Sequence, residues 1–122
     1  MAKKTVLVID DDEVLLSTIQ PMLEKGGFSV VTENSGSGGF DAIRYSLPDL
    51  IILDTIMPEM DGIEFLGQLK SQVRTKNIPV IMLSADANAH NVSTCMALGA
   101  KYYMAKPFDR DKLVECVRKL VC

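Results

Sequence analysis

Five side chains that could do chemistry together lie at the ends of short apolar segments: Asp10, Asp11, Asp54, Ser84 and Lys106. The apolar segments before them are residues 5–9, 50–53, 80–83 and 102–105. Short apolar runs joined by helix-length connections are typical of buried parallel strands, and right-handed crossovers bring the carboxyl ends of such strands to one sheet edge. Open α/β sheets bind their ligands at that edge. We therefore expect a pocket of three carboxylates, a hydroxyl and an ammonium.

Three carboxylates at one sheet edge predict a divalent cation. Unit charges about 4 Å apart interact by roughly 4 kcal/mol at an effective dielectric constant of 20, so the carboxylates repel one another unless a cation compensates them. A few oxygen ligands with room for water suit Mg²⁺ better than a full calcium site. We expect Asp10 and Asp11 to hold the ion, directly or through water. Mg²⁺ also neutralises phosphoryl oxygens, which lets an anionic carboxylate approach a phosphoryl donor.

Asp54 is the candidate phosphoryl acceptor, because carboxylates form acyl phosphates in several phosphoryl-transfer systems. Lys106 would pair with the arriving phosphoryl charge. Ser84 would donate its hydroxyl hydrogen to a phosphoryl oxygen, and the small side chain of Ala85 leaves that space open. Without a phosphoryl group, we expect Lys106 to pair with Asp54.

The elements that position these residues alternate between strand and helix. Apolar patterns predict strands at residues 4–9, 28–32, 49–53, 80–83 and 101–105, each followed by a helix. The strand at 28–32 carries no reactive residue, which favours an edge position. The resulting fold class is α/β, a doubly wound (βα)5 arrangement.

Helical periodicity also predicts which residues face the core: Leu15, Ile19, Met22, Leu23, Phe40, Ile43, Leu47, Leu66, Leu69, Val73, Val92, Cys95, Met96, Leu113, Val117, Leu120 and Val121. Pro21 removes a backbone donor inside the first helix, so we expect a kink or an early end there. The glycines at 36, 38 and 39 predict fraying of the second helix's first turn. Asp61 and Asp109 are expected to cap the third and fifth helices.

The composition of the chain argues against several classes of function. A chain of 122 residues suits one domain, residues 1–122, and the net charge of −3 without a basic stripe argues against direct binding of nucleic acid. No apolar stretch reaches the length of a transmembrane span, and the charged start does not resemble a signal peptide, so we expect a cytoplasmic protein without a membrane partner. Three cysteines without metal-ligand spacing favour free thiols.

Four motifs occur together and in order: VLVIDDDE, LIILDTIMPEMDG, VIMLSA and YYMAKPF. With them the whole chain resembles a response-regulator receiver domain of two-component signal transduction, close to the single-domain chemotaxis type. The resemblance implies a flavodoxin-like, three-layer sandwich whose parallel five-stranded sheet has the order 2-1-3-4-5. It also implies a regulatory phosphoacceptor rather than an enzyme, although such domains catalyse their own phosphorylation and dephosphorylation.

The resemblance further implies a role for each site residue. Asp54 would take the phosphoryl group from a phosphohistidine of a sensor histidine kinase or phosphotransfer protein. Asp10, Asp11, Asp54 and the backbone carbonyl of Ile56 would bind Mg²⁺. Ser84 and Tyr103 would form a switch pair that alters the surface of the fourth helix, fifth strand and fifth helix for an unknown downstream protein. Lys106-Pro107 resembles the family's cis peptide.

Two positions depart from the most common pattern of the family. Ile56 and Asp86 lie where side chains modulate hydrolysis of the acyl phosphate. The resemblance therefore does not fix the lifetime of the phosphorylated state. We hypothesise that the apolar side chain of Ile56 slows the attack of water.

Other interpretations remain open at this point. Asp10 and Asp12 fit the aspartate-x-aspartate opening of a small haloacid-dehalogenase-like phosphatase in which Asp10 is the nucleophile, but Asp54 then has no role. A flavodoxin-like flavin binder and a receiver-shaped scaffold that is never phosphorylated are the further alternatives. Asp12 and Glu13 also suit a helix N-terminus, where the macrodipole favours acids. An aromatic residue on a strand, such as Tyr103, more often packs than switches.

Overall fold

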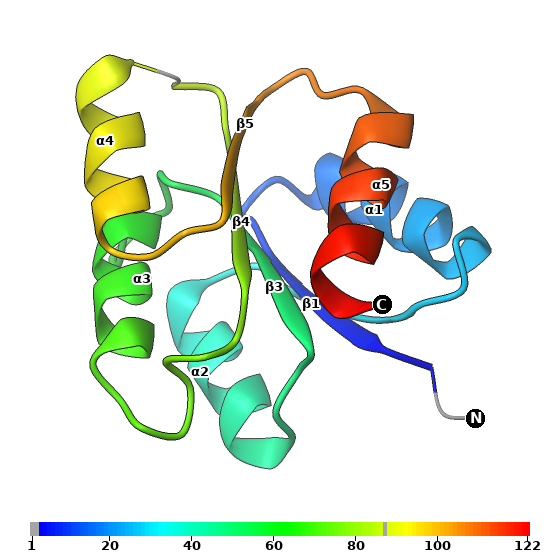
Figure 1. The fold of residues 1–122 in the computed structure, drawn as a ribbon, viewed down its shortest axis with the longest axis horizontal. Helices are drawn as coiled ribbons and strands as arrows, with labels where there is room; N and C mark the ends of the chain where they lie inside the picture. Colours follow the sequence, from blue (N-terminus) through cyan, green and yellow to red (C-terminus); the bar gives the residue numbers. More distant parts are fainter. Residues whose placement is uncertain (1–2, 87) are drawn as a thin grey trace.

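Five strands and five helices alternate along the described part of the chain, residues 3–86 and 88–122 of a computed structural model (Figure 1). The strands are β1 (Thr5–Ile9), β2 (Ser29–Glu33), β3 (Leu50–Leu53), β4 (Val80–Ser84) and β5 (Tyr102–Ala105). The helices are α1 (Glu13–Lys25), α2 (Gly36–Tyr45), α3 (Gly62–Lys70), α4 (Ala89–Ala97) and α5 (Arg110–Val121).

The sheet is parallel throughout, and its strand order is β2-β1-β3-β4-β5, as predicted. Helices α1 and α5 cover one face, while α2, α3 and α4 cover the other (Figure 1). Successive residues of β1 serve both cores: Val6 and Val8 pack under α1 and α5, whereas Leu7 and Ile9 pack on the opposite side. The doubly wound, three-layer fold is therefore confirmed.

Each helix begins at a side chain that caps its first turn. The caps are Asp12, Ser35, Asp61, Asn88 and Asp109. Their side-chain oxygens accept hydrogen bonds from backbone N–H groups that have no partner within the helix. The predicted caps Asp61 and Asp109 are confirmed, and Asp12 has the structural role expected of an acid at a helix N-terminus.

The structure bears on two expectations about helix regularity. The early end of the first helix is wrong, because α1 continues past Pro21 to Lys25. Pro21 lies on the exposed side and removes only one backbone hydrogen bond. A kink at Pro21 and fraying of the first turn of α2 stay predictions. The first turn of α2 is formed and capped, with Ser35 Oγ accepting from the N–H of Gly38. A Cβ atom on Gly39 would lie 2.6 Å from Ile9 Cδ1, so this glycine allows α2 to pack closely on β1.

Of the 17 predicted core residues, eight are buried, six are half-buried and three are exposed. Leu47, Val73 and Met96 are exposed. The first two lie beyond the ends of α2 and α3, so the helical pattern no longer applies to them. Phe65 is fully buried instead and stacks on Phe40, with ring centroids 4.1 Å apart. In α1, Leu16 rather than Leu15 and Met22 is fully buried.

Length and apolarity together decide whether a helix can cross a membrane. Within residues 3–86 and 88–122, no helix meets both requirements.

Candidate functional site

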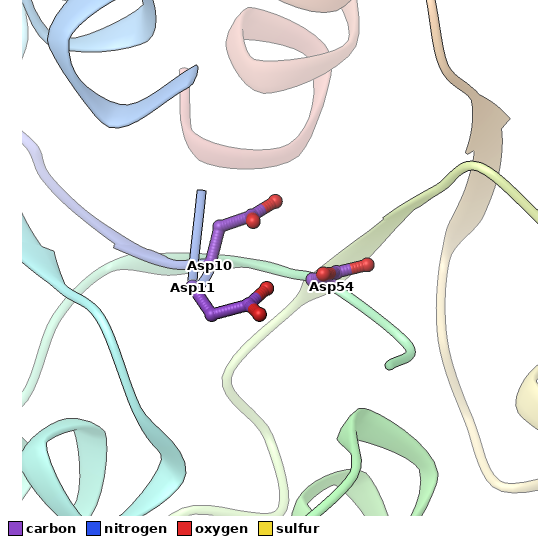
Figure 2. A group of neighbouring side chains, drawn as sticks. All are labelled: Asp10, Asp11 and Asp54. Carbon is purple, nitrogen blue, oxygen red and sulfur yellow. The ribbon is translucent and has the colours of Figure 1, made fainter. Parts of the chain in front are cut away.

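Three carboxylates gather at the carboxyl end of the sheet. Asp10 and Asp11 follow β1, and Asp54 follows β3, the neighbouring strand. One carboxylate oxygen from each of the three lies within 4.8 Å of the others (Figure 2). Asp10 and Asp54 are buried, whereas Asp11 is exposed. The parallel topology thus brings acids that are more than 40 residues apart in sequence into one cluster, open to solvent on the Asp11 side.

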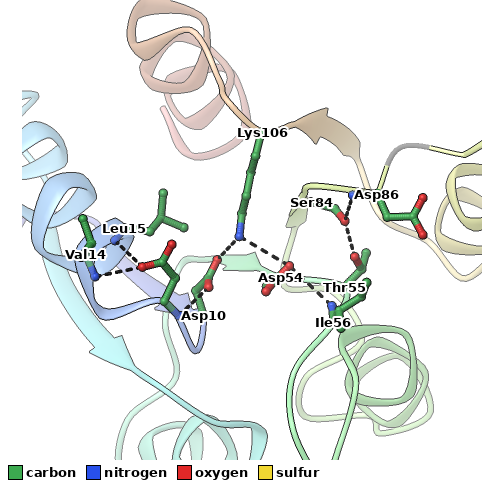
Figure 3. A network of polar contacts seen from close by, with 10 residues as sticks. Asp10, Val14, Leu15, Asp54, Thr55, Ile56, Ser84, Asp86 and Lys106 are labelled. Atoms are coloured by element: carbon green, nitrogen blue, oxygen red, sulfur yellow. Dashed lines mark hydrogen bonds and ion pairs between the residues drawn. The ribbon is translucent and has the colours of Figure 1, made fainter.

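The Lys106 ammonium enters this cluster from the end of β5 (Figure 3). Lys106 Nζ donates to Asp10 Oδ2 at 2.7 Å and lies 3.6 Å from Asp54 Oδ1. The expected ion pair of Lys106 with Asp54 is therefore present, and the structure adds Asp10 as the closer, hydrogen-bonded partner. Lys106-Pro107 is a cis peptide, as the resemblance implied.

Asp54 and Lys106 both have shifted pKa values. Burial and the charge of Asp10 raise the pKa of Asp54 to about 6, although Lys106 opposes the shift. Burial alone would lower the pKa of Lys106, but the hydrogen bond and charge of Asp10 outweigh it and raise that pKa. The cluster therefore holds more negative charge than one ammonium can balance.

The donor set fits Mg²⁺ in charge and in spacing. Three carboxylates and one ammonium leave two negative charges, which one divalent cation balances. Mg²⁺ binds oxygens at about 2.1 Å, so opposite ligands of an octahedral ion lie about 4.2 Å apart. One oxygen of each carboxylate lies within 4.8 Å of the other two, which is compatible with that spacing. Carboxylate oxygens with an exposed side for water are the ligands that this ion prefers.

The raised pKa of Asp54 predicts a pH-dependent gain in stability for Asp54→Asn in metal-free buffer. The folded-state value of about 6 exceeds the ordinary 3.8, so ionising Asp54 costs the folded protein stability above pH 6 and nothing below about pH 4. We expect the variant to be more stable by about 1–3 kcal/mol at pH 7.5. The gain should fade as the pH falls from 6 to 4.

Urea unfolding with a chelator present measures this difference at each pH. Asp41→Asn is the matched control, because Asp41 is an exposed carboxylate whose ion-pair partner Arg44 is also exposed. An Asp54→Asn variant whose stability relative to wild type is the same at pH 4 and pH 7.5 would contradict the prediction.

The Ser84 hydroxyl is buried and is bonded to two neighbours. Ser84 Oγ shares a hydrogen bond with Thr55 Oγ1 and accepts from the N–H of Asp86 at 3.0 Å (Figure 3). Thr55 is also buried, and the sequence analysis missed it. The sequence did offer a signal for Thr55, because it is a hydroxyl residue directly after the candidate acceptor Asp54. Ser84 thus lies at the site, with its hydroxyl engaged by Thr55.

Tyr103 and Asp86 connect the end of β4 to α4. The Tyr103 hydroxyl donates to the backbone carbonyl of Asp86, and the ring packs against the core beneath α2, α3 and α4. The Asp86 carboxylate accepts from the side-chain amides of Asn88 and Asn91 at 2.8 and 3.1 Å. Asp86 is therefore bonded to the start of α4.

The loop after Asp54 contains two further features of the site. Ile56 is 60 % exposed, and its N–H lies 3.5 Å from Asp54 Oδ1, so its peptide group adjoins the acceptor. Gly62 packs directly on the main chain of Asp54, where an added Cβ would lie 1.8 Å from the carbonyl oxygen. Its N–H donates to the Thr55 carbonyl at 2.8 Å. This glycine holds the loop against the end of β3.

Fold and site together define a class of protein: a doubly wound α/β domain with an acidic cluster and a half-buried lysine at the carboxyl ends of its parallel strands. The response regulator receiver domain family matches residues 6–118, and the chain belongs to that family. The resemblance inferred from the motifs is thereby confirmed.

Individual relatives agree with this assignment. The transcriptional regulatory protein CseB of Streptomyces avermitilis is 36% identical over 122 residues, which cover 99% of this chain and 51% of the relative. The alkaline phosphatase synthesis transcriptional regulatory protein PhoP of Bacillus subtilis is 37% identical over 106 residues, 87% of this chain and 43% of the relative. The chain spans about half the length of these curated relatives.

Solved structures also match over nearly the whole chain. The chemotaxis protein CheY4 of Vibrio cholerae has a TM-score of 0.91 at 27% identity and covers 98% of this chain and 99% of its own. A putative response regulator from Chloroflexus aurantiacus has a TM-score of 0.92 at 29% identity, with 98% of both chains covered. The protein is a response regulator receiver domain, related to the regulators of two-component signal transduction.

Proposed function

We propose that this receiver domain accepts a phosphoryl group on Asp54 from a phosphohistidine of a sensor histidine kinase or phosphotransfer protein. The observation that carries the proposal is the cluster of Asp54 with two further carboxylates and one ammonium. A buried carboxylate whose charge the site does not fully balance is suited to attack an electrophilic phosphorus atom. Membership of the receiver family supports the same assignment.

In the proposed transfer, an oxygen of Asp54 forms the new bond to phosphorus while the bond from phosphorus to the histidine nitrogen breaks. The imidazole keeps that electron pair and takes up a proton. Mg²⁺, held by Asp10, Asp11, Asp54 and the Ile56 carbonyl, would neutralise charge on the transferred oxygens. Lys106 Nζ, which lies 3.6 Å from Asp54, would exchange Asp10 for a phosphoryl oxygen. Ser84 would donate to a second phosphoryl oxygen.

We propose a regulatory role for the phosphorylated domain, which would catalyse only its own phosphorylation and dephosphorylation. Ser84 and Tyr103 would change the surface formed by α4, β5 and α5, and a downstream protein would bind there. Moving such a switch from 1:99 to 99:1 requires that phosphorylation favour the active state by about 5.5 kcal/mol. The net charge of −3 favours a protein rather than nucleic acid as the direct partner of this domain.

The test is phosphorylation of the wild-type protein by a small phosphodonor. With Mg²⁺ present, we expect the intact mass to rise by one phosphoryl group, and we expect hydroxylamine to remove it as it removes acyl phosphates. A chelator should abolish the gain, because the three acids then repel the donor. A protein that gains no phosphoryl group under any of these conditions would contradict the proposal.

Ile56→Asn is expected to shorten the lifetime of the acyl phosphate by about 3- to 10-fold. Ile56 is 60 % exposed beside Asp54, so its apolar side chain lies where water must approach, whereas an amide can hydrogen-bond and orient that water. The measurement is the decay of phosphoprotein after the donor is removed. Ile56→Val keeps an apolar side chain and serves as the control. Equal decay rates for the Asn and Val variants would show that this position does not control hydrolysis.

A further inference from the structure

Two buried hydroxyl groups contact each other beside the acceptor. Ser84 is 0 % and Thr55 is 2 % exposed, and their side-chain oxygens are hydrogen-bonded. Figure 3 shows the Asp54 carboxylate turned toward Lys106, while the Thr55 hydroxyl is turned toward Ser84. The Ser84 hydroxyl is thus held by Thr55 rather than directed at the acceptor.

Only the side chain of Ser84 is free to change direction. Its main chain pairs with Ala105 in the parallel register of β4 and β5, and its carbonyl accepts from the N–H of Lys106 at 2.8 Å. The hydroxyl therefore reorients by rotation about the Cα–Cβ bond. Serine has one heavy atom on Cβ besides the main chain, so this rotation carries no second branch through the packed core.

The bond between Ser84 and Thr55 depends on the direction of the Ser84 side chain. Either hydroxyl of the pair can be the donor, and Ser84 Oγ also accepts from the N–H of Asp86. Both side chains are buried, so the two hydroxyl groups satisfy each other when Asp54 carries no phosphoryl group. A buried hydroxyl that loses its partner is costly. Ser84 gives up this bond when it turns to a phosphoryl oxygen.

We propose that Thr55 is a positioning residue that holds the Ser84 hydroxyl in a resting orientation and thereby opposes its binding to a phosphoryl group on Asp54. This inference rests on the proposed function of Asp54. The resting orientation keeps the bonds to Thr55 and to the N–H of Asp86, and the bound orientation exchanges Thr55 for a phosphoryl oxygen. Thr55 therefore sets the balance between two states of the same side chain.

The same exchange reaches α4 through Asp86. Its N–H donates to Ser84, its carbonyl accepts from Tyr103, and its carboxylate is bonded to Asn88 and Asn91 at the start of α4. Asp86 alone therefore links the Ser84 hydroxyl to the start of α4, the helix that would carry the signal. Thr55 lies at the opposite end of this chain of hydrogen bonds.

The test uses trifluoroberyllate with Mg²⁺, a mimic of the phosphoryl group, and isothermal titration of the full chain. Thr55→Val keeps the volume and removes the hydroxyl, so the resting orientation of Ser84 loses its hydrogen bond to residue 55, which the bound orientation does not use. We expect Thr55→Val to bind the mimic about 3- to 10-fold more tightly than wild type. Thr55→Ser retains a hydroxyl and should restore wild-type affinity. Thr55→Ala provides a second hydroxyl-free variant and should change the affinity in the same direction.

The same substitution is then made in the Ser84→Ala variant. Without the serine hydroxyl, Thr55→Val should no longer change the affinity for the mimic, because no Ser84 hydroxyl remains for Thr55 to hold. Affinity that is unchanged or weaker in Thr55→Val, or a gain that persists with Ser84→Ala, would overturn the role of Thr55 while Asp54 remains the acceptor. A wild-type protein that binds no mimic would instead contradict the function proposed for Asp54, and the role of Thr55 with it.

Discussion

Asp54→Asn is expected to lose phosphoryl incorporation completely, whereas Asp10→Asn should still become phosphorylated, more slowly, and on Asp54. The geometry explains the difference. Asp10 Oδ2 is occupied by Lys106 at 2.7 Å and Asp10 Oδ1 accepts from the N–H of Asp12 at 2.9 Å, so both Asp10 oxygens are engaged. Asp54 Oδ1 has two longer contacts, 3.6 Å to the ammonium and 3.5 Å to the N–H of Ile56. Its carboxylate is therefore the freer nucleophile, and Asp10 is suited to hold a cation.

Intact mass after incubation with Mg²⁺ and a small phosphodonor measures incorporation, and peptide mapping after borohydride reduction locates the acyl phosphate. Asp41→Asn is the control for the same chemical change at an exposed carboxylate. Urea unfolding of Asp54→Asn in the same Mg²⁺ buffer shows whether the variant is folded, so that loss of incorporation can be separated from unfolding. Phosphate found on Asp10 would favour the haloacid-dehalogenase-like alternative and exclude the receiver mechanism.

Gly62→Ala is expected to destabilise the protein by at least about 3 kcal/mol. The added Cβ would lie 1.8 Å from the Asp54 carbonyl oxygen and 2.9 Å from Thr55 Cα. Both are main-chain atoms, so no side-chain rotation relieves the overlap, and the start of α3 must move away from the end of β3. That movement breaks the 2.8 Å hydrogen bond from the Gly62 N–H to the Thr55 carbonyl.

The free energy of unfolding in urea measures this effect, and α3 offers a matched control. Gly67 lies in the same helix, and an added Cβ there has no neighbour within 4 Å. Gly67→Ala should therefore stabilise the protein by about 0.5–1 kcal/mol, because alanine favours the helix over glycine. If Gly62→Ala were also neutral or stabilising, the loop would be able to move without cost and the close contact would have no structural role.

The alternation of strands and helices and the parallel sheet could be predicted from the sequence because the central strands are apolar on both faces. The strand order, by contrast, came only from the resemblance to the receiver family. The run from Val6 to Ile9 has no polar alternation, which is possible only where both faces are covered by helices. That pattern, with acids placed directly after it, also predicts the meeting of Asp10 and Asp54 at one sheet edge. The positions of these two carboxylates therefore follow from the topology and from the burial of the strands.

Helix ends and individual side-chain contacts could not be predicted from the sequence pattern. The helical periodicity of Leu47 and Val73 continues past the ends of α2 and α3, so it does not show where each helix stops. The sequence placed Lys106 at the sheet edge, but the direction of a long side chain decides that Asp10 is the nearer carboxylate. Thr55 was missed because its role depends on a neighbour 29 residues away.

The ion pair between Lys106 and Asp10 joins residues 96 positions apart, across a sheet in which β3 and β4 separate their strands. Asp10 follows β1 and Lys106 follows β5, so this pair can form only when β5 lies in place beside β4. The ammonium of the acidic cluster therefore depends on the strand farthest from the one that carries its carboxylate partner. Displacing β5 would remove the cluster's lysine without moving any of its three acids.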